Sequence, residues 1–214
     1  MPLPSASFGT TEYFFRANKN LLHITLLLIA ALLVNSCGLL TEVPENSDQE
    51  PEDFKAFLAN SSARNDYDDL VYFLASHDVH EIVPIWQLLQ QGTDWRNHGL
   101  SKFAVPPRET WNSMVNTLVF LKYDLVPYIG PVEVLSGFRT PTYNRVAVGA
   151  RKSRHMSFSA LDLKPVDDIN RSRLHEILKN RWENFGDTYN LGLGLYSGRR
   201  FHIDTGGYLS LIHI

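Results

Sequence analysis

The chain has 214 residues, enough for an export segment, a linker and one domain of roughly 150 residues with its own core. Its formal net charge is -3, from 20 Lys and Arg against 23 Asp and Glu. The chain therefore lacks the excess of positive charge that nucleic-acid binding normally requires, and we expect no nucleic-acid partner. The single cysteine, Cys37, excludes an internal disulfide and zinc sites built on paired cysteines, which leaves His and carboxylate side chains as ligands for any metal.

An apolar segment near the N-terminus predicts export from the cytoplasm. Residues 21–34 read LLHITLLLIAALLV, the length of a signal-peptide core and short for a helix that spans a bilayer, and Arg16 and Lys19 precede it. The segment ends in Asn35-Ser36-Cys37, which resembles the lipobox of bacterial lipoproteins, where the cysteine is lipidated and becomes the new N-terminus. The alternative is an uncleaved signal anchor that ends in an incidental cysteine.

This resemblance implies that residues 1–37 are a signal peptide or membrane anchor, with Cys37 as the lipidation site. Gly38 follows the cysteine where an inner-membrane retention signal would usually show Asp, which favours the outer membrane of a Gram-negative cell. We therefore expect a periplasm-facing lipoprotein of the cell envelope that contacts the membrane through its N-terminal lipid or anchor.

An acidic spacer and a helical region are predicted next. Residues 38–53 contain the run TEVPENSDQEPED, with two prolines and few large apolar side chains, which is typical of a solvated linker. The folded domain is expected over residues 54–208, and its first part up to Leu89 looks helical, with Pro84 as an interruption. One helical face is predicted from the spacing of Tyr67, Leu70, Val71 and Leu74.

A long helix and then a small sheet complete the predicted domain. The helix should open at Pro106-Pro107 and end at Pro127, with an apolar face that includes Trp111, Met114 and Leu118. A later helix around Leu174 to Trp182 should be capped by Asp167 and Asp168. The predicted strands are residues 131–135, 159–164, 191–196 and 201–204. This order predicts an α+β fold in a single domain, with N-terminal helices followed by a small, mostly antiparallel sheet that carries a metal site.

The last six residues call for a separate interpretation. Residues 209–214 read LSLIHI, which resembles the translation of a transposase adapter used in sequencing libraries. We expect this tail to be adapter-derived, with a genuine apolar end strand as the alternative. On either interpretation His213 is not counted as a metal ligand.

Two short segments supply two imidazoles and two carboxylates. His155 and Asp162 lie in SRHMSFSALD, and His202 and Asp204 lie in FHID. A catalytic zinc typically has three N or O protein ligands and an open fourth position, so two His and one Asp fit in number and type. Residues two apart on a strand share a face, which predicts that His202 and Asp204 lie side by side and that Asp204 lies beside the metal.

These segments and two others resemble the M15 zinc peptidases, in particular the penicillin-insensitive murein endopeptidases and related D-alanyl-D-alanine carboxypeptidases. The resemblance extends from about residue 70 to Tyr208. Its motifs are SGFRTP at residues 136–141 with Asn144, the His-x6-Asp spacing of His155 and Asp162, GLGLY at residues 192–196, and HID at residues 202–204. Each motif is weak alone, but all four in this order are a rather specific signal.

The resemblance implies a peptidase with a Zn²⁺ cofactor and a peptidoglycan stem peptide as substrate. The implied metal ligands are His155, Asp162 and His202. Arg139 is implied to face the substrate, where its planar fork suits a carboxylate or a developing oxyanion, and the alternative is a structural ion pair. We also expect Ser153 and Tyr196, which belong to or adjoin these motifs, to bind substrate.

The sequence departs from the family pattern at two positions. In several relatives a carboxylate three residues before the last His ligand accepts a proton from the attacking water, but Arg199 stands there. Asp204 is the remaining local candidate for this catalytic role, or it orients a ligand imidazole, and Glu133 and Asp187 are more remote candidates. Phe158 replaces a glycine that is common three residues after the first His ligand, which predicts a bulkier pocket floor.

The expected function is hydrolysis of peptide bonds involving D-amino acids in peptidoglycan stem peptides or cross-links, by a monomeric endopeptidase or carboxypeptidase. The alternative is a catalytically silent, zinc-containing peptidoglycan-binding module, which Arg199 and Phe158 favour and the intact ligand set disfavours. A serine or cysteine hydrolase has no support, because Cys37 precedes the domain and the sequence has no Gly-x-Ser-x-Gly motif.

Overall fold

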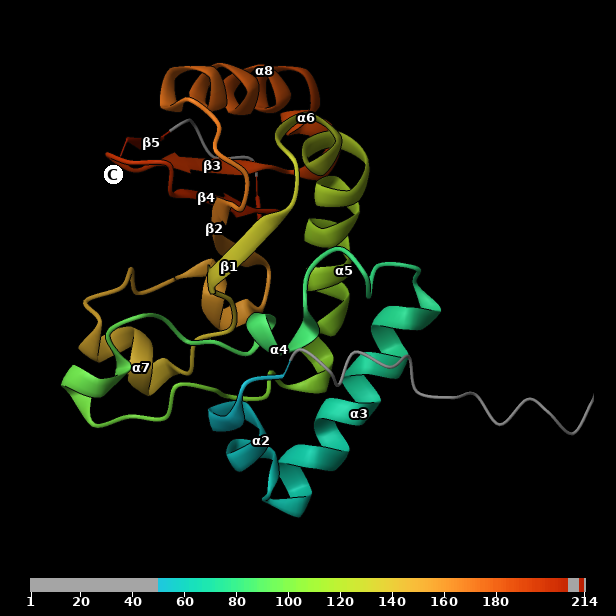
Figure 1. The fold of residues 1–214 in the computed structure, drawn as a ribbon, viewed down its shortest axis with the longest axis vertical. Coiled ribbons are helices and arrows are strands. Elements are labelled where there is room, and N and C mark those ends of the chain that lie inside the picture. The colour runs from blue at the N-terminus through green and yellow to red at the C-terminus, as the bar shows by residue number, and fades with distance from the viewer. Residues whose placement is uncertain (1–49, 208–211, 214) are drawn as a thin grey trace, which may run out of the picture. The chain divides into compact units, whose positions relative to one another are not determined.

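The computed structural model describes residues 50–207 and 212–213, so the predicted signal segment and Cys37 lie outside the described residues. Helices come first in the chain and most of the sheet follows, which confirms the α+β class (Figure 1). The helices are α2 (Glu52–Leu58), α3 (Ser61–Ser76), α4 (Ile85–Leu88), α5 (Trp111–Phe120), α6 (Val126–Ile129), α7 (Pro141–Val146) and α8 (Arg171–Tyr189). The strands are β1 (Val132–Ser136), β2 (Ala160–Pro165), β3 (Gly192–Leu195), β4 (Phe201–Asp204) and β5 (Ile212–His213).

The first helices form a scaffold with a buried apolar face. The Asn60 side chain caps α3 by accepting a hydrogen bond from the Ser62 amide. The predicted face of α3 is confirmed, because its four apolar residues are 3% exposed or less: Tyr67, Leu70, Val71 and Leu74. Among the helices in the described ranges, we find none whose length and apolar character would suffice to cross a bilayer.

The predicted long helix differs from the structure at both ends. Its first turn is the 3-10 segment Arg108–Thr110, and α5 ends at Phe120, where a π-helical turn over Leu121–Leu125 follows. Pro127 does not end the helix, because it lies in the first turn of α6, where the missing amide hydrogen would have no helical partner. The prediction was wrong here because the π-turn starts a new hydrogen-bonding frame just before the proline.

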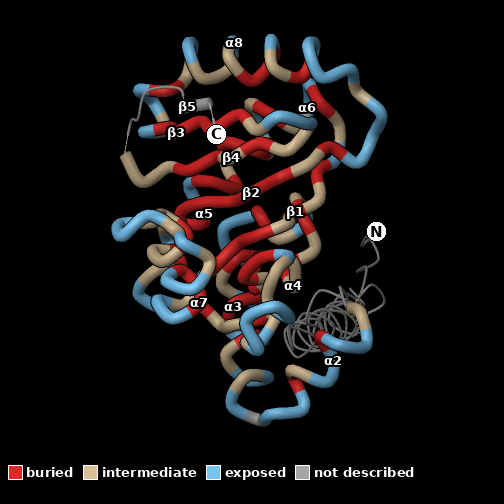
Figure 2. Tube along the Cα trace, turned by 90° about the vertical axis from the view of Figure 1, so that its left-hand side faces the viewer, coloured by how far each residue is buried: buried red, intermediate tan, exposed pale blue. Residues whose placement is uncertain are grey.

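The sheet has the order β1-β2-β4-β3-β5, in which every described pairing is antiparallel except that of β3 with β5. One set of side chains on the central strands, including Leu161, Leu163 and Ile203, is 1% exposed or less and lies in the core. Figure 2 shows that burial follows β1 to β4 along most of their length. Because side chains alternate along a strand, the residues between these core positions point to the other face, where the candidate site lies.

Helix α8 follows β2 and contacts β3, and its predicted apolar residues Leu174, Ile177 and Leu178 are buried. The predicted capping residues were wrong. Asn170 is the cap, because its side-chain oxygen accepts hydrogen bonds from the amides of Ser172 and Arg173. The helix starts two to three residues later than caps at Asp168 or Asp167 would require.

The predicted strands agree with β1 to β4 within one residue at each end, and β4 agrees at both ends. In the tail, Ile212–His213 pairs in parallel with β3, with Gly194 opposite Ile212. The origin of this tail stays a prediction.

Candidate metal centre

Neighbouring strands place the candidate residues in one row across the sheet. Asp162 on β2 lies directly opposite His202 on β4, and on the other side of β4 His202 lies opposite Gly194 of β3. Directly paired residues of antiparallel strands have their Cβ atoms about 4.5–5.5 Å apart. The strand register therefore brings together two residues that are 40 positions apart in the sequence.

His155 enters the same space from a short turn. It lies in the 3-10 segment Arg154–Ser157, just before β2, and it is 3% exposed. Its Nδ1 lies 2.8 Å from the carbonyl oxygen of Gly137, which can only accept a hydrogen bond, so Nδ1 carries the hydrogen. Burial lowers the pKa of His155 more than its contact with Asp162 raises it, and the imidazole is therefore neutral at pH 7, with the Nε2 lone pair available to a metal.

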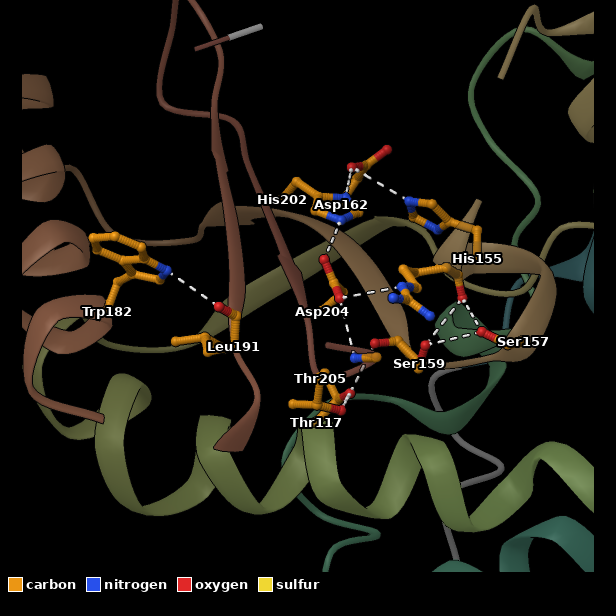
Figure 3. Close-up of polar contacts among 12 residues, drawn as sticks. Thr117, His155, Ser157, Ser159, Asp162, Trp182, Leu191, His202, Asp204 and Thr205 are labelled. Atoms are coloured by element: carbon orange, nitrogen blue, oxygen red, sulfur yellow. Dashed lines mark hydrogen bonds and ion pairs between the residues drawn. The ribbon is translucent and has the colours of Figure 1, made fainter. Parts of the chain in front are cut away.

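The three predicted ligands converge on a space that suits a metal ion (Figure 3). One ligand atom from each of His155, Asp162 and His202 lies within 4.8 Å of the other two. Asp162 Oδ1 lies 3.6 Å from His155 Nε2 and 3.1 Å from His202 Nδ1, so both imidazoles face the same carboxylate oxygen. Two imidazole nitrogens and one carboxylate oxygen are a donor set typical of catalytic zinc.

The second oxygen of Asp162 is held by two arginines. Arg139 Nη2 and Arg200 Nη2 donate to Oδ2 over 2.7 and 2.8 Å, and Tyr196 donates its hydroxyl to Oδ1 over 3.1 Å. Burial by itself raises the pKa of Asp162, but the contacts of this carboxylate with His155 and His202 outweigh burial and hold the pKa well below its usual range. Asp162 is therefore an ionised, oriented carboxylate at neutral pH.

His202 lies between two carboxylates. Its Nδ1 faces Asp162, and its Nε2 lies 3.3 Å from Asp204 Oδ2, which confirms that His202 and Asp204 are side by side. Burial lowers the pKa of His202, but hydrogen bonds with Asp162 and Asp204 raise it to about 9 in the metal-free protein. Since Nδ1 is the nitrogen that faces Asp162, Asp204 contacts the nitrogen on the far side of the ring.

Asp204 is a buried carboxylate, 2% exposed, whose two oxygens are both engaged. Oδ1 accepts a hydrogen bond from the Gly206 amide over 3.0 Å and lies 3.9 Å from Arg154 Nε. A Cβ atom on Gly192, the residue opposite Asp204 on β3, would lie 2.1 Å from Oδ2. This arrangement is that of a carboxylate that orients a ligand imidazole, and of the two predicted roles of Asp204 it favours that one.

A cavity of about 710 Å³ opens beside the candidate metal ligands. His155, His202 and Asp204 line it, together with the three residues predicted to bind substrate, which are Arg139, Ser153 and Tyr196. Arg139 also makes the ion pair with Asp162 that was the alternative interpretation of this residue. Its contact with a substrate stays a prediction, as do those of Ser153 and Tyr196.

The residues at the departures from the family pattern lie away from the cavity. Phe158 is fully buried and packs edge-on against Phe138 in the core, so it does not form the pocket floor. Arg199 pairs with Asp168 over 3.0 Å on the surface. Glu133 on β1 pairs with Lys164 on β2, Asp187 is exposed on α8, and neither carboxylate lines the cavity.

Two residues of the site were missed by the sequence analysis. Arg200 was detectable, because it lies two positions before His202 and therefore shares its face of the strand. Gln91 had no such signal: its carbonyl oxygen accepts from Arg139 Nε and Ser136, and its side-chain oxygen accepts from Thr140. Gln91 thus fixes the position of Arg139 from a loop 48 residues away.

Comparison with known proteins assigns this chain to a family. Residues 81–204, more than half of the chain, match the sequence profile of the family described as Peptidase M15. The matched range includes all three candidate metal ligands and Asp204. No curated protein and no solved structure gave a significant match.

Proposed function

Because the chain belongs to the Peptidase M15 family, we propose that it is a zinc-dependent peptidase that hydrolyses peptide bonds involving D-amino acids in peptidoglycan stem peptides or cross-links. The observation that carries the proposal is the convergence of ligand atoms from His155, Asp162 and His202 within 4.8 Å, beside a cavity. The proposal covers endopeptidase and carboxypeptidase activity alike.

The residues around the site have separate tasks in this reaction. When bound, Zn²⁺ supplies a Lewis acid that polarises the scissile carbonyl and makes water nucleophilic near neutral pH. The Gly137 carbonyl keeps the lone pair of His155 Nε2 directed at the site, and Arg200 keeps Asp162 oriented. Arg139 lines the cavity, where its guanidinium can bind a substrate carboxylate or stabilise the developing oxyanion.

A peptidase also needs a group that takes a proton from water and passes it to the leaving amine. Asp204 is the only acidic side chain among the described residues that line the cavity, but it is engaged with His202 and Gly206. This favours a second candidate function, a catalytically silent zinc-containing module that binds peptidoglycan. We place peptidase activity first because a silent module has no need of a complete set of metal ligands.

The proposal is tested by incubating isolated muropeptides with the purified zinc-loaded protein and analysing the products by chromatography and mass spectrometry. We expect new products that correspond to cleavage at a D-amino acid, and loss of both zinc and cleavage in His155→Ala. Full zinc content without cleavage of any muropeptide would contradict the peptidase and support the binding module.

We further propose that the protein is anchored in the cell envelope as a monomeric lipoprotein, facing the periplasm from the outer membrane. The support is the lipobox-like sequence that ends at Cys37. Labelling with a fatty-acid probe should mark wild type but not Cys37→Ala, and the variant should leave the membrane fraction. If Cys37→Ala is processed and fractionates as wild type does, the lipoprotein assignment is wrong.

A further inference from the structure

A loop on the wall of the cavity carries several cations that have no carboxylate partner in the part of the chain that the structure describes. We name residues 145–152 the rim loop; it consists of the last two residues of α7 and the segment that leads from them to the turn that holds His155. Its three cations, Arg145, Arg151 and Lys152, are exposed, and none forms an ion pair with another residue of the ranges 50–207 and 212–213. Lys152 lines the cavity itself.

The charge balance around the cavity differs from that of the whole chain. The chain has a net charge of -3, whereas the described lining of the cavity contains three Lys or Arg residues and one acidic residue, besides His155 and His202. Arg139 forms an ion pair with Asp162, which also pairs with Arg200, and Arg154 lies 3.9 Å from Asp204. Among the Lys and Arg side chains of this lining, Lys152 is the one that forms no ion pair with another described residue.

The rim loop is fixed in place by buried contacts. Asn144 is 4% exposed, and its side-chain amide nitrogen donates a hydrogen bond to the Ala150 carbonyl over 3.0 Å. The main-chain carbonyl of Asn144 accepts a hydrogen bond from the Gly149 amide over 2.8 Å. A Cβ atom at Gly149 would lie 2.1 Å from Asn144 Oδ1, so only glycine fits there. These contacts hold Val148 at a φ of 53°, which is an unfavourable backbone conformation for a β-branched residue. The Val148 side chain is 91% exposed.

We infer that the rim loop binds a second carboxylate of the substrate, on a side chain near the scissile bond, so that the protein prefers peptides in which this carboxylate is free. The inference rests on the proposed function and names its substrate class. Lys152 lies three residues before His155 and faces the same cavity, and its ammonium is an exposed point charge suited to a mobile carboxylate. An exposed ion pair between a lysine and a carboxylate contributes modestly to the binding free energy, and salt weakens it.

The test uses two synthetic stem peptides that differ in one side-chain carboxylate, free in one and amidated in the other. Their kcat/KM is measured with the zinc-loaded full chain, wild type and the double variant Arg151→Gln/Lys152→Gln, at low and high ionic strength. We expect wild type to prefer the free acid by about 3- to 10-fold at low salt, and the double variant to lose most of this preference. Arg171→Gln is the matched control, because Arg171 is exposed at the start of α8 and does not line the cavity.

Binding of the same two peptides, measured by fluorescence anisotropy, separates this inference from the proposed function. If neither peptide is cleaved but the free acid binds more tightly and the double variant loses the difference, the peptidase proposal fails and the rim-loop inference stands. Equal binding and equal cleavage of the two peptides by wild type would overturn the inference. So would a preference that survives in the double variant.

Discussion

Replacing Asp204 with Asn distinguishes the two roles that this carboxylate can have. Asn keeps the size of the side chain and can still accept the hydrogen bond of His202 Nε2, but it loses the negative charge that makes this imidazole a better ligand. Since Asp204 contacts the far nitrogen of His202, we expect zinc affinity to fall about 10- to 100-fold, which is about 1.4 to 2.7 kcal/mol. Cleavage should recover substantially when zinc is saturating.

The assay is a competitive zinc titration with a chromogenic chelator, followed by the muropeptide cleavage rate on the same preparation. Asp187→Asn is the control, because Asp187 is exposed on α8 and the same chemical change there should alter neither quantity. The opposite result, unchanged zinc affinity with turnover lower by roughly 100-fold or more, would show that Asp204 accepts a proton in the reaction and that the orienting role is wrong.

Three further predictions follow from single contacts. Gly192→Ala should weaken zinc binding at least about 10-fold, because its Cβ would displace Asp204, whereas Gly198→Ala, with no heavy atom within 4 Å, should not; equal affinities would refute this. Phe158→Gly should lower the free energy of unfolding in urea by about 2–4 kcal/mol, since loss of a buried ring outweighs about 1 kcal/mol of relieved left-handed strain, and an unchanged midpoint would contradict it. Zinc affinity should rise by up to about tenfold per pH unit below about pH 9, because metal replaces the His202 proton, and a flat profile from pH 6 to about 8 would contradict this.

The same pKa predicts how pH affects the metal-free fold. The pKa of His202 is raised from 6.5 to about 9, so the folded state holds this proton more tightly than the unfolded state. Its stabilising contribution is complete below pH 6.5 and is lost as the pH rises through about 9. The depressed pKa of Asp162 acts in the opposite sense, because its contribution is present above pH 3.8 and is lost at lower pH.

Local sequence patterns predicted the strands well because the core residues alternate with site residues. Leu161, Asp162 and Leu163 alternate between core and site, and the same alternation at Phe201–Asp204 places His202 and Asp204 together. What no local pattern contains is the register between strands, which sets Asp162 opposite His202 and Gly192 opposite Asp204. Chain order and spacing could suggest the ligands only through a family resemblance.

The errors came from effects that local propensity leaves undetermined. Asp167 and Asp168 have the same capping chemistry as Asn170, so the position of the helix start depended on how the chain leaves β2. Phe158 was expected in the pocket, but its left-handed backbone directs the ring into the core against Phe138. Gln91 holds Arg139 through its backbone carbonyl, an interaction that a sequence cannot reveal.

The most direct test of the metal centre is X-ray absorption at the zinc edge on the wild-type protein loaded with one equivalent of zinc. We predict nitrogen and oxygen neighbours at about 2.0–2.2 Å, no sulfur, and the outer-shell scattering of two imidazoles, from His155 and His202. A sulfur neighbour, scattering from fewer than two imidazoles, or failure to retain zinc would contradict the assignment of His155, Asp162 and His202 as its ligands.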